Sequence, residues 1–222
     1  MDNLKVLYED NHVIVVIKPK GIPSQEDKTK DLDMLTIVKK YIKEKYNKPG
    51  EVYLGLVHRL DRMTEGIMVF ARTSKGASRL SESIRLGDFK KEYLAVVEGN
   101  FDGSGKLENY LFKDERNNIS YVVDENKKGA KLASLDYTVL GHTKYNDKEY
   151  TYVKIKLHTG RHHQIRVQFS NIGHTLYGDV KYGGVKGDLA LYAYKLKFVH
   201  PTKDDILEFE SMPERKGIWR DI

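Results

Sequence analysis

The sequence contains no cysteine. A disulfide framework, a cysteine-based zinc site, an iron–sulfur cluster and a cysteine nucleophile are therefore excluded. Long hydrophobic runs are lacking too, because the longest, Val13–Ile17, is far too short to cross a bilayer. The chain does not open with a charged-then-apolar leader of the secretory kind. We therefore expect a cytoplasmic protein with no membrane partner.

The composition is that of an ordinary folded protein. Of the 222 residues, 40% are hydrophobic and 32% are charged, which argues against a disordered chain. There is no internal repeat, low-complexity tract or proline-rich linker, so we predict one domain over residues 1–222. The net charge of +6 is compatible with a polyanionic partner, and equally with a lysine-rich proteome.

The first ninety residues mix strands and helices. Val13–Ile17 is a β-branched run typical of a buried strand, and Ile67–Ala71 is a second short apolar strand. Asp33 is placed to cap a helix that closes before residue 49. Thr73 is placed to cap another helix, which Gly87 would end.

Strands dominate the rest of the chain. Alternating or apolar runs predict strands at residues 93–97, 135–139, 153–157, 189–199 and 206–210. Gln164–Ile172 is ambiguous, although its apolar residues fit helical spacing. This pattern favours an α+β fold with a mixed, mostly antiparallel sheet flanked by helices and loops.

One candidate for chemistry is a carboxylate between two arginines. Asp61 lies in the segment His58–Gly66, which joins two apolar stretches. Neighbouring cations favour the ionised carboxylate, and a positioned Asp can act as a nucleophile or stabilise a developing cation. The alternative is a surface loop held by arginine–aspartate salt bridges.

Two further segments are rich in polar or aromatic groups. Leu157–Arg166 carries donors and titratable side chains just after a strand, and three histidines there suggest a metal site only weakly. A polar binding surface is the stronger interpretation. Tyr93 is either a core aromatic or a flat platform for a nucleobase. The composition of the whole chain fits RNA recognition, because its 15 tyrosines and 38 basic residues supply aromatic and cationic side chains.

Four motifs together resemble the RluA-type RNA pseudouridine synthases. They are Lys18-Pro19-Lys20-Gly21, His58-Arg59-Leu60-Asp61 with Thr64 and Gly66, Lys91-Glu92-Tyr93-Leu94-Ala95, and Thr159-Gly160-Arg161-His162-His163-Gln164-Ile165-Arg166. Their order agrees with the family, and the resemblance runs from about residue 7 to residue 209. Glu65 stands where the family usually has serine, and His162 where it usually has threonine or serine. We expect no S4-like RNA-binding module before the catalytic domain.

The resemblance implies that the protein isomerises specific uridines in RNA to pseudouridine. The N-glycosidic bond breaks, the uracil turns, and C5 bonds to C1′. Because no redox step or group donor is involved, no cofactor and no metal are expected. The implied partner is a structured ribosomal or transfer RNA stem-loop. No protein partner is implied, and we expect a monomer.

The resemblance also implies the roles of individual residues. Asp61, Tyr93 and Arg166 are expected to be catalytic: Arg166 would pair with Asp61, and Tyr93 would stack on the flipped uracil. Arg59 would fill the space that the flipped base leaves, which helps to offset the cost of unstacking. The expected substrate-binding residues are Arg59, His58, Arg62, Ile165, Arg161, Gln164 and Lys18. The expected phosphate contacts are Lys18, Lys20, Arg62, Arg161, Lys154 and Lys156.

Three other functions stay open at this stage. A carboxylate-dependent N-glycosylase would release free uracil, although such sites usually pair two carboxylates. A catalytically silent RNA-binding module is disfavoured because Asp61, Tyr93 and Arg166 are all present. A metal-dependent hydrolase would be sensitive to chelators.

Overall fold

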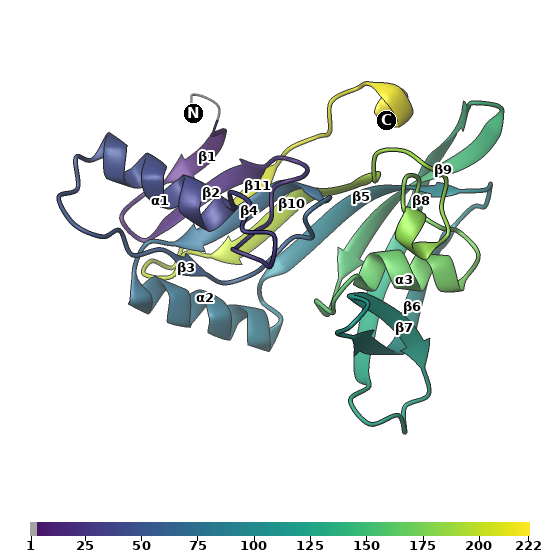
Figure 1. Ribbon diagram of the computed structural model, residues 1–222, viewed down its shortest axis with the longest axis horizontal. Helices are drawn as coiled ribbons and strands as arrows, with labels where there is room; N and C mark the ends of the chain where they lie inside the picture. Colours follow the sequence, from purple (N-terminus) through teal and green to yellow (C-terminus); the bar gives the residue numbers. More distant parts are fainter. Residues whose placement is uncertain (1–3) are drawn as a thin grey trace. The chain divides into compact units, whose positions relative to one another are not determined.

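The structure is a computed structural model that describes residues 4–222. The chain forms two compact units: Met1–Lys91 with Ala193–Met212, called unit 1, and Glu92–Tyr192 with Pro213–Ile222, called unit 2. The chain passes from one unit to the other three times: inside the strands β5 (Lys90–Glu98) and β10 (Leu191–Val199), which are labelled in Figure 1, and again between Met212 and Pro213. Each unit is described by itself below.

Unit 1 contains an antiparallel sheet and two helices. Its strands are β1 (Val6–Glu9), β2 (Val13–Lys18), β3 (Gly55–Leu56), β4 (Glu65–Ala71) and β11 (Ile206–Glu210). Strand β2 lies between β1 and β4, β3 pairs with β4, and β11 pairs with β10. The register of β2 against β4 sets Lys18 opposite Gly66, beside the loop that carries Asp61.

Position 66 requires glycine for two reasons: its backbone conformation and the close approach of Ala193. Its φ is +126°, which L side chains rarely adopt, and a Cβ built there would lie 2.3 Å from the carbonyl oxygen of Ala193. The start of β4 therefore packs directly on the backbone of β10, with no room for a side chain. This close approach fixes the point where the Asp61 loop enters the sheet.

The two helices of unit 1 begin at the capping residues that the sequence predicts. Asp33 accepts a hydrogen bond from the Thr36 N–H at the start of α1 (Met34–Lys45). Thr73 does the same for Gly76 at the start of α2 (Ser74–Leu86). Helix α2 ends at Gly87, which takes the left-handed conformation that glycine allows. These predictions are confirmed.

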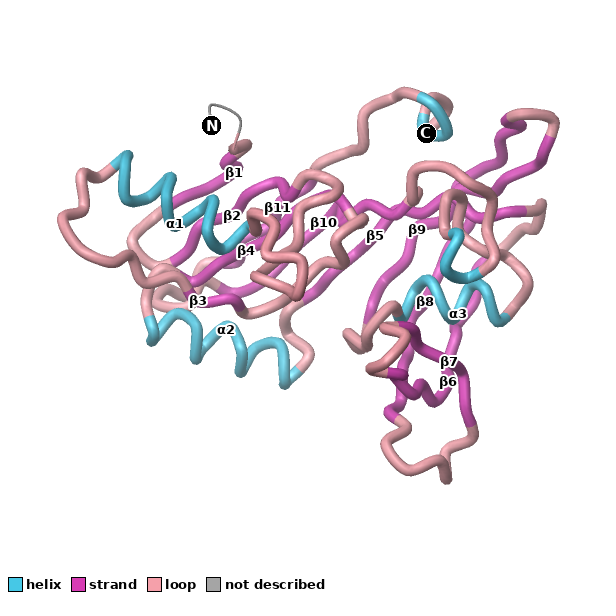
Figure 2. The backbone as a smooth tube through the Cα atoms, in the orientation of Figure 1, coloured by secondary structure: helices cyan, strands magenta, loops and turns pink. Residues whose placement is uncertain are grey.

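One face of the unit 1 sheet packs against α2. Leu80 of α2 is fully buried in a cluster with alternate residues of β2 and β4, such as Val15 and Val69, and with Phe89 and Phe198. Because successive residues of a strand point to opposite faces, the intervening side chains of β2 and β4 belong to the other face, and they are buried as well. Figure 2 shows how much of this unit is strand and helix.

Unit 2 is built on long antiparallel strands. These are β6 (Ser104–Asp114), β7 (Ile119–Val123), β8 (Lys131–Tyr145) and β9 (Lys148–Leu157), in the order β9-β8-β6-β7. Helix α3 (Gln164–Asn171) follows β9, and the 3-10 turns η1 (Val180–Tyr182) and η2 (Gly217–Trp219) come later. The helical reading of the ambiguous segment is confirmed. The sequence did not predict β6 and β7.

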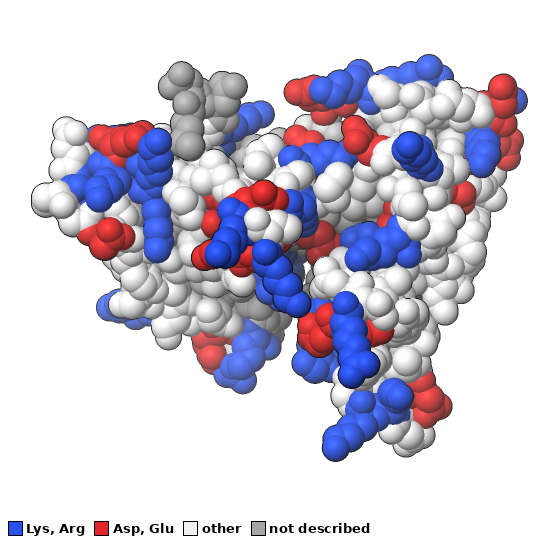
Figure 3. All heavy atoms as spheres, viewed as in Figure 1, with Lys and Arg blue, Asp and Glu red and all other residues white. Residues whose placement is uncertain are grey.

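The α+β fold class is confirmed, and each strand pair named above is antiparallel. Lys, Arg, Asp and Glu side chains are interspersed on the face of the molecule in Figure 3. Among the helices described, none is long and apolar enough to cross a membrane.

Candidate active site

The loop that carries Asp61 belongs to unit 1 and is held on both sides of the carboxylate. The Asp61 carbonyl accepts the N–H of Thr64 at 3.0 Å, which closes a tight turn. The preceding residue, Leu60, donates its N–H to the Ser24 hydroxyl and accepts that hydroxyl's proton at its carbonyl, at 3.0 and 2.7 Å. The Asp61 side chain is half-buried and Arg59 is exposed. The backbone thus presents the carboxylate from a fixed turn.

Lys18 supports the same turn from below and does not reach the surface. Its side chain is fully buried, and its ammonium donates to the carbonyls of Pro19, Ile22 and Arg62 at 2.8, 2.7 and 2.9 Å. Three acceptors match the three N–H groups of a protonated lysine. Burial lowers the pKa of Lys18 to about 7, against the opposing pull of the Asp61 carboxylate. The predicted phosphate contact of Lys18 is therefore wrong.

Arg62 is engaged by two acidic residues from an earlier loop. Its guanidinium donates to Asp31 at 2.6 Å and to Asp27 at 2.9 Å, and also to the Thr29 hydroxyl. Hydrogen bonds from the Thr29 hydroxyl and from Arg62 lower the pKa of Asp27 to about 2, and the two carboxylates raise the pKa of Arg62. With two carboxylates balancing its charge, Arg62 ties the Asp27–Asp31 loop to the Asp61 turn. A contact between Arg62 and RNA stays a prediction.

His58 anchors the start of the loop on the sheet. Its Nε2 accepts the backbone N–H of Val69 at 3.1 Å, and its ring centroid lies 5.5 Å from that of Phe89. Burial, reinforced by the positive charge of Lys91, lowers the pKa of His58 to about 3. The ring is therefore neutral, and Nδ1 is buried with no hydrogen-bond partner among the described residues. Contact between His58 and RNA stays a prediction.

The depressed pKa of His58 predicts an acid-sensitive fold. Between pH 6.5 and 3 the unfolded chain binds a proton that the folded ring does not, so stability present above pH 6.5 is lost as the pH falls. At pH 4.5 this group should account for about 2.7 kcal/mol. His58→Gln keeps an acceptor without titrating, so its free energy of unfolding should fall about 2.5 kcal/mol less than that of the wild type between pH 7 and pH 4.5.

Urea unfolding at the two pH values measures this difference. The matched control is His158→Gln, because His158 lies in a more exposed pair with Asp136. The control should lose as much stability on acidification as the wild type. Equal losses in the wild type and in His58→Gln would contradict the assignment.

Gln164 and Arg161 shape the backbone before α3. The Gln164 side-chain oxygen accepts from the Thr159 hydroxyl at 2.7 Å and from the Arg161 N–H at 3.0 Å, while its amide nitrogen donates to the Ser134 carbonyl at 3.1 Å. Gln164 is buried, and these hydrogen bonds hold the backbone before α3 in place. A contact between Gln164 and the substrate stays a prediction. Arg161 is exposed, and its Nε donates to the Leu132 carbonyl at 2.8 Å.

Three other predicted residues of unit 2 are buried, whereas Lys154 is half-buried and Lys156 is exposed. Tyr93 lies on β5 with 6% of its surface exposed, and Ile165 on α3 with 4%. Arg166, one residue further along α3, is 8% exposed. A buried guanidinium needs a partner, and the structure supplies one that the sequence analysis missed.

That partner is Asp179, whose carboxylate is 1% exposed. It accepts from Nε and Nη2 of Arg166 at 2.7 and 2.6 Å, a bidentate fork. The Arg166 guanidinium also lies over the ring of Tyr182, 5.2 Å from its centroid. The signal in the sequence was an acidic residue placed directly after a glycine, in a loop rich in glycine between residues 173 and 184.

The three histidines near α3 each bind a neighbouring side chain. His158 pairs with Asp136 at 2.7 Å, His162 Nδ1 lies 2.9 Å from the Ser120 hydroxyl, and His163 Nδ1 lies 3.0 Å from the Tyr182 hydroxyl. No group of three or more His, Asp or Glu side chains within residues 4–222 is arranged to hold a metal ion.

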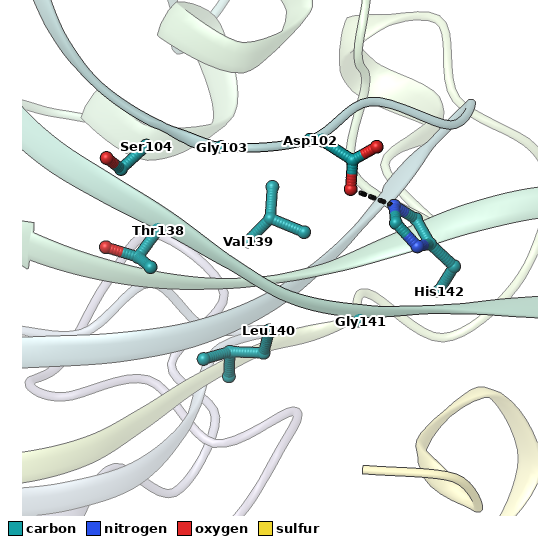
Figure 4. A pocket seen from close by; sticks show the side chains of 8 residues that line it. All are labelled: Asp102, Gly103, Ser104, Thr138, Val139, Leu140, Gly141 and His142. Carbon is teal, nitrogen blue, oxygen red and sulfur yellow. Dashed lines mark ion pairs between the residues drawn. The ribbon is translucent and has the colours of Figure 1, made fainter.

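A hollow in unit 2 lies outside all the predicted motifs. It is lined by Asp102–Ser104 and Thr138–His142, where the pairing of β8 with β9 shifts register next to Leu140 (Figure 4). The only polar pair drawn in it is Asp102 with His142, at 3.5 Å. His142 also bonds the Phe101 carbonyl. We attribute the hollow to the irregular pairing of β8 at this point, and we assign it no function.

Comparison with known proteins places the chain in a family. The family described as RNA pseudouridylate synthase matches residues 12–171, a segment that includes Asp61, Tyr93 and Arg166. This chain belongs to that family. It is an isomerase that forms pseudouridine in RNA, as the resemblance implied.

Relatives and solved structures agree with the assignment. The chain is 31% identical to the ribosomal large subunit pseudouridine synthase D of Yersinia pestis, over 95% of this chain and 68% of that one. It is 32% identical to the protein of the same name from Borreliella burgdorferi, over 97% and 67%. The structure of human RNA pseudouridylate synthase domain containing 1 matches with a TM-score of 0.75 and 25% identity, over 96% of this chain and 84% of that chain.

Proposed function

We propose that the two units form a single catalytic domain, residues 1–222, that isomerises uridines in the RNA of the large ribosomal subunit. The observation that carries the proposal is the extent of the family match. It begins in unit 1 and ends in unit 2, and it takes in the Asp61 loop, the Tyr93 strand and the Arg166 helix. The named activity of the relatives on the large ribosomal subunit supports the choice of RNA.

Asp61 is the catalytic carboxylate of the proposed site. The tight turn to Thr64, the Ser24 brace and the buried Lys18 ammonium all fix the backbone around it. A carboxylate held in one geometry loses little freedom when it meets the sugar, which lowers the barrier to reaction. It either attacks C1′ or removes a sugar proton, so that the glycosidic bond breaks and the uracil can turn.

Tyr93, Arg166 and Arg59 complete the proposed site. In this proposal Tyr93 stacks on the uracil, and Arg166 pairs with the Asp61 carboxylate and keeps it ionised. Arg59 is exposed and has the planar, always charged side chain suited to replacing a base that has left its stack. Ile165 forms part of the apolar wall beside the base. The phosphate contacts that remain in the proposal are Lys20, Arg62, Arg161, Lys154 and Lys156.

The reaction itself supplies a direct test. When C5 of the uracil bonds to C1′, the hydrogen on C5 must leave. A transcript of large-subunit ribosomal RNA made with uridine tritiated at C5 should therefore release tritium to water when the purified protein is added. The same RNA digested to nucleosides should contain pseudouridine, and no free uracil should appear.

Two outcomes would redirect the proposal. Free uracil without pseudouridine would identify an N-glycosylase. Activity that EDTA abolishes and a divalent metal restores would identify a metal-dependent enzyme, against our prediction of metal-free catalysis. The choice of ribosomal over transfer RNA is tested by repeating the assay with a pool of unmodified tRNA transcripts. Cytoplasmic location and a monomeric state stay predictions from the sequence.

A further inference from the structure

A second group of residues in unit 2 surrounds Arg166 without belonging to any motif of the sequence analysis. Asp179 and Tyr182 lie on the segment Gly173–Gly184, called here the Asp179 loop. Asp179 holds two nitrogens of the Arg166 guanidinium, and Tyr182 lies under its face. A guanidinium held on one edge and one face has little freedom to rotate. Its orientation is therefore set by the loop.

The Tyr182 ring is itself tied to its neighbours. Its hydroxyl accepts the backbone N–H of Ser120 on β7 at 2.9 Å and lies 3.0 Å from Nδ1 of His163. Burial and the positive charge of Arg166 lower the pKa of His163 to about 2, so the imidazole is neutral and shares one hydrogen bond with the Tyr182 hydroxyl at Nδ1. The ring under Arg166 is thereby fixed from two sides.

The same loop is attached to the strand that carries Tyr93. Leu176 forms a β-bridge with Val97 of β5, and the N–H of Tyr177 donates to the Val96 carbonyl at 2.9 Å. On the other side, a Cβ on Gly178 would lie 2.4 Å from the Asp188 carbonyl. The backbone that presents Asp179 is therefore clamped between β5 and the following segment.

We infer that Asp179 and Tyr182 are positioning residues that set the orientation of the Arg166 guanidinium relative to the strand of Tyr93. The inference rests on the proposed role of Arg166 in catalysis. Asp179 acts through Arg166, so its loss should slow the chemical step while RNA still binds. The expected scale is about 100-fold, the cost of a displacement of about 1 Å in a catalytic constellation.

The experiment compares the full-length wild type with Asp179→Asn, Asp179→Glu and Tyr182→Leu, using the C5-tritiated ribosomal transcript. Single-turnover tritium release gives the rate of chemistry, filter binding gives Kd for the RNA, and thermal melting reports folding. We expect Asp179→Asn to be about 100-fold slower, and Asp179→Glu and Tyr182→Leu about tenfold slower, with Kd within threefold of the wild type. The matched control is Asp124→Asn, an exposed acid of unit 2 bonded to Asn126, which should keep the wild-type rate.

A double-mutant cycle separates positioning from general structural support. In an Arg166→Lys background the fork is already lost, so adding Asp179→Asn should lower the rate by less than threefold. A further 100-fold loss would show that Asp179 acts independently of Arg166 and would overturn the inference. If Asp179→Asn does not fold, Asp179→Glu keeps the test open, because a folded Asp179→Glu protein with the wild-type rate overturns the inference as well.

The outcomes distinguish this inference from the function on which it rests. If Arg166→Lys keeps the wild-type rate, the proposed role of Arg166 fails, and the positioning role of Asp179 fails with it. If Arg166→Lys is slow but Asp179→Asn is not, only the positioning role fails.

Discussion

Replacing Asp61 by asparagine should lower the rate of pseudouridine formation by at least about 1,000-fold, equivalent to about 4 kcal/mol of transition-state stabilisation. Asparagine keeps the size of the side chain and removes the charge that the reaction needs. The turn at Asp61 is closed by backbone groups and by Ser24, so we expect the backbone to keep this turn in the variant. We expect single-turnover tritium release to collapse while the melting temperature changes by only a few degrees.

The matched control for this prediction is Glu65→Gln. Glu65 is the other carboxylate of the same segment, at the first position of β4, and it stands where the family usually has serine. Its replacement should keep the rate within about tenfold of the wild type. If Asp61→Asn itself stays within tenfold, a barrier change of only about 1.4 kcal/mol, Asp61 is not the catalytic carboxylate.

Lys18→Met should be the most destabilising single change in this part of the protein. Three carbonyls would lose the buried ammonium that donates to them. Removing one partner of a buried charged network costs about 3–5 kcal/mol, which in a chain of this size lowers the melting temperature by about 10 °C. One of those carbonyls belongs to Arg62, next to Asp61, so the rate measured below the melting temperature should fall too.

The pH dependence of Lys18→Met gives a second check. The folded pKa of Lys18 is about 7 and the ordinary value is 10.5, so between these values the unfolded chain binds more protons. The wild type therefore gains stability relative to Lys18→Met as the pH rises, by about 2–3 kcal/mol between pH 7 and 9. Lys28→Met, at an exposed lysine, should change stability by less than about 0.5 kcal/mol. If Lys18→Met is as stable as Lys28→Met, the buried ammonium of Lys18 does not stabilise the fold.

Local signals were sufficient for much of the fold. The caps at Asp33 and Thr73 and the stop at Gly87 act within three or four residues, so they could be located from the sequence. Strands β6 and β7 could not be predicted in the same way. Most of their side chains are partly or fully exposed, so they lack clean apolar alternation and depend on pairing with β8.

The site shows the same division between local and distant contacts. The sequence displays the charges of Lys18 and Arg62 but not their partners, which lie up to 44 residues away along the chain. Lys18 was therefore assigned to RNA although its ammonium binds carbonyls of the protein itself, and the ion pairs of Arg62 with Asp27 and Asp31 could not be predicted. Asp179 was missed because its partner is also distant in the sequence. Nothing within its own neighbourhood shows that it meets Arg166, 13 residues earlier.

Mapping pseudouridine across the large-subunit ribosomal RNA tests the central claim most directly. The RNA is taken from cells that lack the gene and carry either the wild-type protein, Asp61→Asn or an empty vector. We predict that at least one pseudouridine is absent with the empty vector, returns with the wild type and does not return with Asp61→Asn. A full set of pseudouridines in cells without the gene, or restoration by Asp61→Asn, would contradict the account.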